Sequence, residues 1–96
     1  MTELRPCYAF MGNTLRQQFN KICEEVEELR AALDDYEADP DNVEKFGHMV
    51  EEAGDVQFST ETFNAIAGLD TEGRDAVRAM IYAKDDKRGY FKKRAE

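Results

Sequence analysis

The sequence is poor in several residue types that mark particular classes of protein. Its 96 residues include no tryptophan, one histidine, two prolines and two cysteines, and no apolar run approaches the roughly 18 residues of a membrane-spanning helix. The first ten residues, MTELRPCYAF, lack the basic and apolar regions of an export signal. We therefore expect a soluble, cytoplasmic protein without a membrane partner, in which Cys7 and Cys23 are free thiols rather than zinc ligands or a disulfide.

The scarcity of glycine and proline also limits the domain organisation. The chain has six glycines, no serine-rich stretch and no internal repeat, so it offers no candidate linker. We expect a single domain over residues 1–96. Because 35% of the residues are charged and 42% are apolar, this domain can form only a thin core by itself. Further burial between subunits is therefore expected.

The net charge is negative and unevenly distributed. Twenty-one acidic and 13 basic residues give −8, which disfavours nucleic acid as a partner. Residues 24–55 carry 13 acidic and two basic residues, whereas the rest of the chain carries eight acidic and 11 basic residues. Solvated helix faces would explain this pattern as readily as a functional site would, so the spacing of the charges has to distinguish the two.

Apolar residues recur at the steps of three and four that are typical of amphipathic helices. They predict one helix over 13–38, a second over 41–68 and a shorter third over 71–88, between an N-terminal segment, 1–12, and a basic tail, 89–96. No segment has the alternation of a strand, so the predicted fold class is all-α. The predicted N-caps are Asn13 for the first helix, Asp39 or Asp41 for the second, and Asp70 or Thr71 for the third.

These helices have more apolar surface than they can cover within one chain. Two long amphipathic helices and one short helix leave much of their apolar stripes exposed, which predicts homodimerisation through helix packing. Gly47 and Gly54 lie inside the second helix, where glycine is unfavourable. Their presence indicates that another backbone packs closely at these two points.

Acidic side chains form two groups on the predicted helices. Glu25 and Glu28 are three residues apart on one flank of the first helix, and Glu24 lies one turn from Glu28. Glu52 and Asp55 have the same spacing on the second helix. Like charges at this spacing repel each other, and the repulsion is less screened near a core boundary. A positive charge must therefore be supplied.

Few basic side chains are in helical register to supply that charge. Lys21 lies one turn before Glu25, whereas the second helix has no lysine or arginine from His48 to Ser59. His48 itself lies one turn before Glu52, but a single histidine is more often a surface or packing residue than a ligand. Mg²⁺ prefers hard oxygen ligands, so the sequence predicts a Mg²⁺ site formed by four carboxylates: Glu25, Glu28, Glu52 and Asp55.

The acidic motifs resemble those of a known family. Residues 24–28 read E-E-x-x-E and residues 52–55 read E-x-x-D, with 23 residues between them, which together resemble the signature of the MazG-like all-alpha nucleoside triphosphate pyrophosphohydrolases. The segments KICEEVEELRAAL and VEEAGDVQF are similar to the two metal-binding helices of the family. AKDDKRGYF is similar to its K-x-x-x-R-x-Y ending, and the resemblance spans roughly residues 13–91.

The resemblance implies hydrolysis of an NTP or dNTP to a nucleoside monophosphate and diphosphate. It implies two or more Mg²⁺ ions per site, with Mn²⁺ as a substitute, and a catalytic role for Glu24 and Glu25, in which Glu24 holds an extra ion or polarises the water. It further implies a four-helix core made by the first two helices of two subunits, as a dimer or a dimer of dimers. Stand-alone and phage-encoded members of this size act on dUTP, dCTP or dGTP pools, and GTP is a further candidate; for a phage protein the location would be the host cytoplasm.

Binding of the nucleotide is assigned to side chains outside the acidic motifs. The resemblance implies that phosphate is met by Lys84, Arg88 and Tyr90, with the basic residues drawn from either chain, and the charge of Lys87 makes it a further candidate. These basic side chains also suit the C-terminus of a helix, whose dipole they complement. Polar or aromatic candidates for the base are Asn13, Gln17, Asn20 and Phe10, and the sequence does not choose among them.

Two other functions remain open. Phosphoribosyl-ATP pyrophosphohydrolase is similar in size, helices and acidic motifs, but that family typically has alanine where Gly54 stands. The other alternative is a non-catalytic acidic helical module that binds a basic partner protein or mimics the charge of nucleic acid. A non-catalytic module would show no metal-dependent thermal shift and no turnover of nucleotides.

Overall fold

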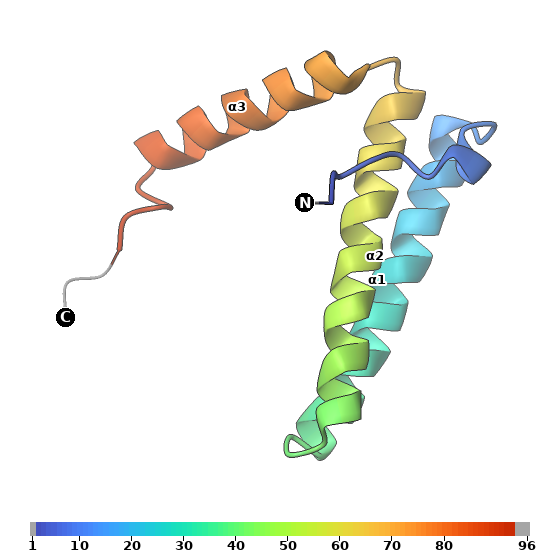
Figure 1. Cartoon of the computed structure of the whole chain (residues 1–96), viewed down its shortest axis with the longest axis vertical. Helices are drawn as coiled ribbons and strands as arrows, with labels where there is room; N and C mark the ends of the chain where they lie inside the picture. The colour runs from blue at the N-terminus through green and yellow to red at the C-terminus, as the bar shows by residue number, and fades with distance from the viewer. Residues whose placement is uncertain (1, 94–96) are drawn as a thin grey trace.

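All regular structure in the described part of the chain is helical. The computed structural model describes residues 2–93. A short 3₁₀ helix, η1 (Tyr8–Phe10), precedes three α-helices, α1 (Leu15–Ala38), α2 (Val43–Ile66) and α3 (Thr71–Lys87). Figure 1 shows α1 and α2 as an antiparallel hairpin, with α3 turning away from the end of α2. The predicted all-α fold class is confirmed for these residues.

Two simple expectations about the chain can be compared with this structure. None of the helices within residues 2–93 has the length and apolar character that a membrane span requires. Cys7 and Cys23 are both free thiols, as predicted, and Cys23 is exposed on α1. Of the predicted basic tail, residues 94–96 lie outside the described residues.

The helix starts differ from the prediction because other side chains form the caps. Thr14, rather than Asn13, caps α1: its hydroxyl accepts from the Gln17 amide at 3.1 Å, and the Gln17 side chain accepts from the Thr14 amide at 2.9 Å. This capping box moves the start from residue 13 to residue 15. Asn42, rather than Asp39 or Asp41, caps α2 through hydrogen bonds from the amides of residues 44 and 45.

Helix α1 ends at Ala38, as predicted, whereas α2 and α3 end before their predicted last residues. Helix α2 runs over 43–66 instead of 41–68, and Gly68 follows it with a φ of +103°, a conformation that favours glycine. Asp70 caps α3 by accepting from the Gly73 amide at 2.8 Å, which decides between the two predicted caps. Helix α3 ends at Lys87, one residue before the predicted end, and Gly89 has a φ of +80°.

The interior of the hairpin is polar. Among the described residues, Ala32 is the only buried member of the hydrophobic class, whereas six polar or charged residues are buried: Gln18, Glu25, Ser59, Glu61, Thr62 and Arg74. The Gln18 side chain donates to the Ser59 carbonyl at 3.1 Å and accepts from Asn13 at 3.0 Å. The contact between α1 and α2 is therefore closed by hydrogen bonds and ion pairs as well as by apolar packing.

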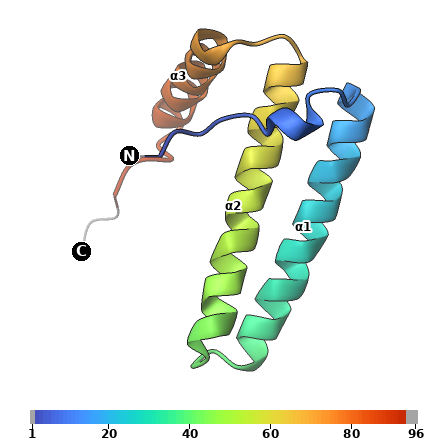
Figure 2. The ribbon, with the colours of Figure 1, turned by 45° about the vertical axis from the view of Figure 1, so that its right-hand side comes forward.

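A buried ion cluster sets the direction of α3. The Glu61 carboxylate of α2, only 4% exposed, accepts from Arg74 Nε at 2.6 Å and from Arg78 Nη1 at 2.8 Å. Arg74 also donates to the Leu69 carbonyl at 2.8 Å. Because these bonds join the last turns of α2 to the first turns of α3, they hold α3 at an angle to the hairpin (Figure 2).

Much apolar surface is exposed in the single chain. Its accessible surface is 7626 Å², whereas a compact monomer of 11.0 kDa exposes about 5,600 Å². Its radius of gyration is 16.0 Å, compared with about 13 Å for a compact chain of this length. On the hairpin the exposed large side chains are Leu15, Phe19, Val26, Leu33, Val43, Phe46 and Val50.

The expected close approach at two glycines is wrong for contacts within the chain. Apart from the nearby backbone of α2 itself, no atom of the described residues lies within 4 Å of the position that a Cβ would take at Gly47 or at Gly54. The two positions therefore face open space on α2, because the hairpin contact uses other sides of this helix. In the described part of the chain, no backbone of another element lies within 4 Å of the Cβ position at either glycine.

Candidate metal centre

Three carboxylates from the two long helices converge at the edge of the hairpin contact, where Glu25 is buried, Glu52 is half-buried and Asp55 is exposed. One ligand oxygen each from Glu25, Glu52 and Asp55 can be chosen so that all three atoms lie within 4.8 Å of one another. Glu25 comes from the side of α1 that faces α2. Glu52 and Asp55 come from one side of α2, because residues three apart in a helix share a face. We call these three residues the carboxylate cluster.

The two glutamates of the carboxylate cluster are largely removed from water. The Glu25 side chain is 12% exposed and that of Glu52 is 14% exposed. The Oε2 atom of each is buried and has no hydrogen-bond partner among residues 2–93. A buried polar atom without a partner costs about 1–3 kcal/mol, and more when it carries charge. The structure therefore places two unpartnered, negatively charged carboxylate oxygens close together. A cation bound between them would neutralise their charge.

Each buried glutamate is contacted from one turn earlier on its own helix. Lys21 Nζ lies 3.2 Å from Glu25 Oε1, and His48 Nε2 lies 3.1 Å from Glu52 Oε1. The hydrogen bond to Glu25 is the main cause that raises the pKa of Lys21, so its ammonium group stays charged at neutral pH. Lys21 also lies over the Phe10 ring, 4.9 Å from its centroid. Lys21 was not among the predicted site residues, although its i, i+4 spacing to Glu25 was visible in the sequence.

The other predicted residues of the first acidic motif border the carboxylate cluster without joining it. Glu28 is exposed and does not belong to the three-residue group. The negative charge of Glu25, then desolvation, then the charge of Glu52 raise the pKa of Glu28, so its carboxyl group is close to both. Glu24 is exposed on α1 and also lies outside the group. The structure thus brings together three of the four predicted ligands and places the fourth beside them.

The predicted phosphate-binding residues are not near the carboxylate cluster within one chain. Lys84, Lys87, Arg88 and Tyr90 are exposed at the C-terminal end of α3 and just after it. Figures 1 and 2 both show this end of α3 well away from α1 and α2. The basic side chains that contact the cluster are instead Lys21, 3.2 Å from Glu25, and His48, 3.1 Å from Glu52.

The predicted base-binding residues have mostly local contacts. The Asn13 side chain donates to Gln18, and the Gln17 side chain is part of the capping box of α1. Phe10 lies beneath the Lys21 ammonium, and Asn20 is exposed on α1. None of these contacts identifies a pocket for a base.

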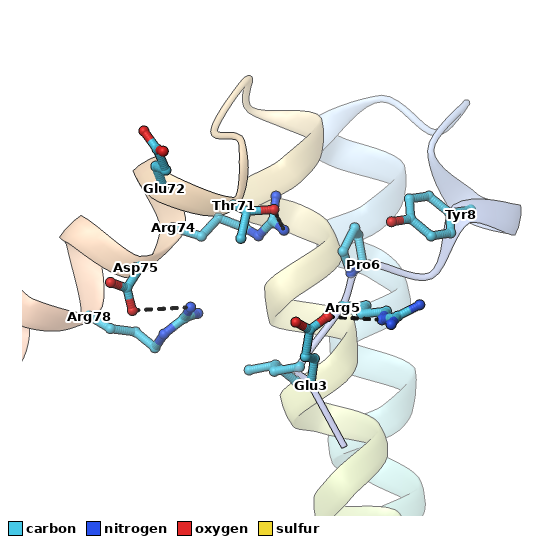
Figure 3. A pocket seen from close by; sticks show the side chains of 10 residues that line it. Glu3, Arg5, Pro6, Tyr8, Thr71, Glu72, Arg74, Asp75 and Arg78 are labelled. Atoms are coloured by element: carbon cyan, nitrogen blue, oxygen red, sulfur yellow. Dashed lines mark hydrogen bonds and ion pairs between the residues drawn. The ribbon is translucent and has the colours of Figure 1, made fainter. Parts of the chain in front are cut away.

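The cavity drawn in Figure 3 lies away from the carboxylate cluster. A cavity of about 590 Å³ separates the N-terminal segment from the start of α3 (Figure 3). Most of its charged lining is already paired, since Arg5 contacts Glu3 at 3.3 Å, and Arg78 contacts Asp75 at 3.8 Å as well as Glu61; the lining residue Glu72 is exposed. It contains no residue of the carboxylate cluster. A ligand of high charge would therefore gain little there.

We expect Lys21→Met to destabilise the metal-free protein by about 1 kcal/mol, which lowers Tm by about 4–8 °C. The substitution removes the only cation that contacts Glu25 within residues 2–93 and leaves the repulsion between carboxylates uncompensated. Addition of Mg²⁺ should therefore raise Tm by more in this variant than in the unsubstituted protein. Differential scanning calorimetry with and without Mg²⁺ measures both effects.

Lys45→Met is the matched control. Lys45 is 32% exposed, compared with 29% for Lys21, and it pairs with Asp35 and Asp39 at 3.4 and 3.7 Å, away from the carboxylate cluster. Its loss should lower Tm slightly and leave the Mg²⁺ effect unchanged. Equal Mg²⁺ effects in both variants would contradict the assignment of a cation to the cluster.

Comparison with family models, with curated proteins and with solved structures found no match to this chain. The functional interpretation therefore rests on its residues and their geometry.

Proposed function

We propose that the protein is a Mg²⁺-dependent nucleoside triphosphate pyrophosphohydrolase of the MazG-like type. The observation that carries this proposal is the pair of buried, unpartnered oxygens on Glu25 and Glu52 beside Asp55. Three carboxylates converging from two helices offer only hard oxygen ligands, which suit Mg²⁺ or Mn²⁺. The residues present therefore fit the ion that the acidic motifs predict.

The proposed reaction joins a water oxygen to the α-phosphorus of the nucleotide. The bond from this phosphorus to the oxygen that bridges the α and β phosphates breaks, and its electron pair leaves with diphosphate. Bound divalent ions would neutralise the phosphate oxygens and make the attacking water more acidic. The cluster would hold the ions, while Glu24 and Glu28, exposed on α1 on either side of Glu25 in the sequence, are proposed to orient the water and accept its proton.

Homodimerisation is part of the proposal. Each chain exposes about 2,000 Å² more surface than a compact monomer of its mass, and obligate dimers bury 2,000 Å² or more in total. Packing two hairpins through their exposed apolar stripes would form a four-helix core around the polar interior. A dimer would also let α3 of one chain bring Lys84 and Arg88 toward the carboxylates of its partner.

The reaction is tested by diphosphate release from the eight standard NTPs and dNTPs, with dUTP, ITP and phosphoribosyl-ATP added, in Mg²⁺ and then in EDTA. We expect turnover of one or a few nucleotides that EDTA abolishes. Turnover of phosphoribosyl-ATP alone would assign the protein to histidine synthesis instead. Absence of turnover across the panel, from folded protein, would contradict the enzyme proposal and favour a non-catalytic acidic module.

A further inference from the structure

The contacts around Glu52 point to a role for the single histidine of the chain. His48 Nε2 lies 3.1 Å from Glu52 Oε1, while Glu52 Oε2 is buried and has no partner. The two oxygens of one carboxylate are thus in different situations. One is held from the solvent side of α2 by a histidine that is 58% exposed, and the other is buried and open to a ligand.

The same arrangement occurs on the facing helix. Lys21 holds Glu25 Oε1 from one turn earlier, and Glu25 Oε2 is again buried without a partner. Each of the two buried glutamates therefore has its Oε1 fixed by a nitrogen at i−4 and its Oε2 unpartnered. Because the pattern repeats on both helices, it is not one accidental contact. It sets the orientation of both carboxylates.

The position of His48 argues against direct ligation. The three-residue group whose ligand atoms lie within 4.8 Å of one another includes Glu52 but not His48. The imidazole thus contacts the outer oxygen of Glu52 and does not converge with Glu25 and Asp55. His48 Nε2 would therefore affect a bound ion only indirectly, by orienting the Glu52 carboxylate. Outer hydrogen-bond partners of metal ligands commonly act in this way.

We propose that His48 is a positioning residue for the divalent-cation site: it donates a hydrogen bond from Nε2 to Glu52 Oε1 and so directs Glu52 Oε2 toward a cation shared with Glu25 and Asp55. This inference rests on the proposed function. Without the bond, repulsion from Glu25, whose ligand oxygen lies within 4.8 Å of that of Glu52, and from the neighbouring Glu28 would turn the Glu52 carboxylate toward solvent. The ion would then lose a preorganised ligand.

The first test measures binding of Mn²⁺ alone, by electron paramagnetic resonance of the free ion. We expect His48→Leu to weaken Mn²⁺ binding about 10- to 100-fold, the range typical for the loss of an outer hydrogen bond to a metal ligand. His48→Gln, which keeps a donor of similar reach, should stay within about threefold of the unsubstituted protein. In a Glu52→Gln background His48→Leu should have no further effect, because the carboxylate through which it acts has already been removed.

The second test reads the proton directly and needs no variant. Since the chain has one histidine, its imidazole ¹⁵N signals are unambiguous, and we expect a protonated Nε2 with and without Mg²⁺. An unprotonated Nε2 in either state would overturn the inference, because it would make His48 an acceptor or a ligand. Equal Mn²⁺ affinity of His48→Leu and the unsubstituted protein would also overturn it.

Failure of the proposed function would look different. If the unsubstituted protein binds Mn²⁺ no more tightly than Glu52→Gln does, the carboxylate cluster is not a cation site, and both proposals fall. If Glu52→Gln loses Mn²⁺ binding while His48→Leu retains it, only the role of His48 is overturned.

Discussion

Glu52→Gln is expected to lower kcat/KM for diphosphate release by at least about 10³-fold, which corresponds to about 4 kcal/mol of transition-state stabilisation. The substitution conserves shape and removes one negative charge from the carboxylate cluster. A carboxylate that binds a divalent ion through a buried oxygen cannot be replaced by an amide without losing most of that attraction. Glu25→Gln and Asp55→Asn should act in the same direction.

The same substitution should have the opposite effect on stability. In the metal-free protein Glu52 is repelled by Glu25, whose ligand oxygen lies within 4.8 Å, and Oε2 of both residues is buried without a partner in the part of the chain that the structure describes. A glutamine amide at position 52 can donate to Glu25, so we expect the metal-free variant to unfold at the same or a slightly higher temperature. Loss of activity together with unchanged or increased stability would assign Glu52 to function rather than to folding.

Glu51→Gln is the matched control for this experiment. Glu51 is the neighbouring residue on α2 and is exposed, so the substitution changes the net charge by the same amount outside the carboxylate cluster. Its activity should stay within about twofold of the unsubstituted protein. A full rate in Glu52→Gln, or equal losses in both variants, would contradict the proposed metal centre.

The sequence was sufficient to predict the features that depend on helical periodicity. The i, i+3 spacing of Glu52 and Asp55 places both on one face of α2 whatever else the chain does. The meeting of Glu25 with Glu52 requires only that two helices joined by a short turn pack antiparallel. For the same reason Gln18 and Ser59, which are 41 residues apart, are hydrogen-bonded across the same hairpin.

Other features depend on choices that the sequence leaves open. Residues 39–42 read DPDN and offer three possible caps within four residues, and the geometry of the turn selects Asn42. The direction of α3 depends on the bonds of Glu61 to Arg74 and Arg78, 13 and 17 residues away, for which there is no periodic signal. Because that direction separates Lys84 and Arg88 from their own carboxylate cluster, the phosphate-binding prediction could not be placed within one chain.

Val26→Asp combined with Leu33→Asp is expected to convert the protein into a monomer that no longer unfolds cooperatively. Both side chains belong to the exposed apolar stripe of α1, at 44% and 40% exposure. Burying a Val or Leu side chain contributes about 1.5–3 kcal/mol, and a symmetric dimer would lose this contribution twice for each substituted position. The loss is then about 6–12 kcal/mol per dimer, or about 3–6 kcal/mol per chain, which reaches the lower part of the 5–15 kcal/mol of stability that a domain has in total.

Sedimentation velocity at micromolar concentration and thermal unfolding by circular dichroism measure the two parts of this prediction. Ala31→Asp is the control, because Ala31 is also exposed on α1 but does not follow the three- and four-residue steps of the stripe. This substitution should leave the sedimenting mass unchanged, and thermal unfolding should remain cooperative with the same Tm. A folded monomer of the unsubstituted protein would contradict the dimer. We expect the dimer because a single hairpin with almost no apolar core would otherwise have to hold the carboxylate cluster alone.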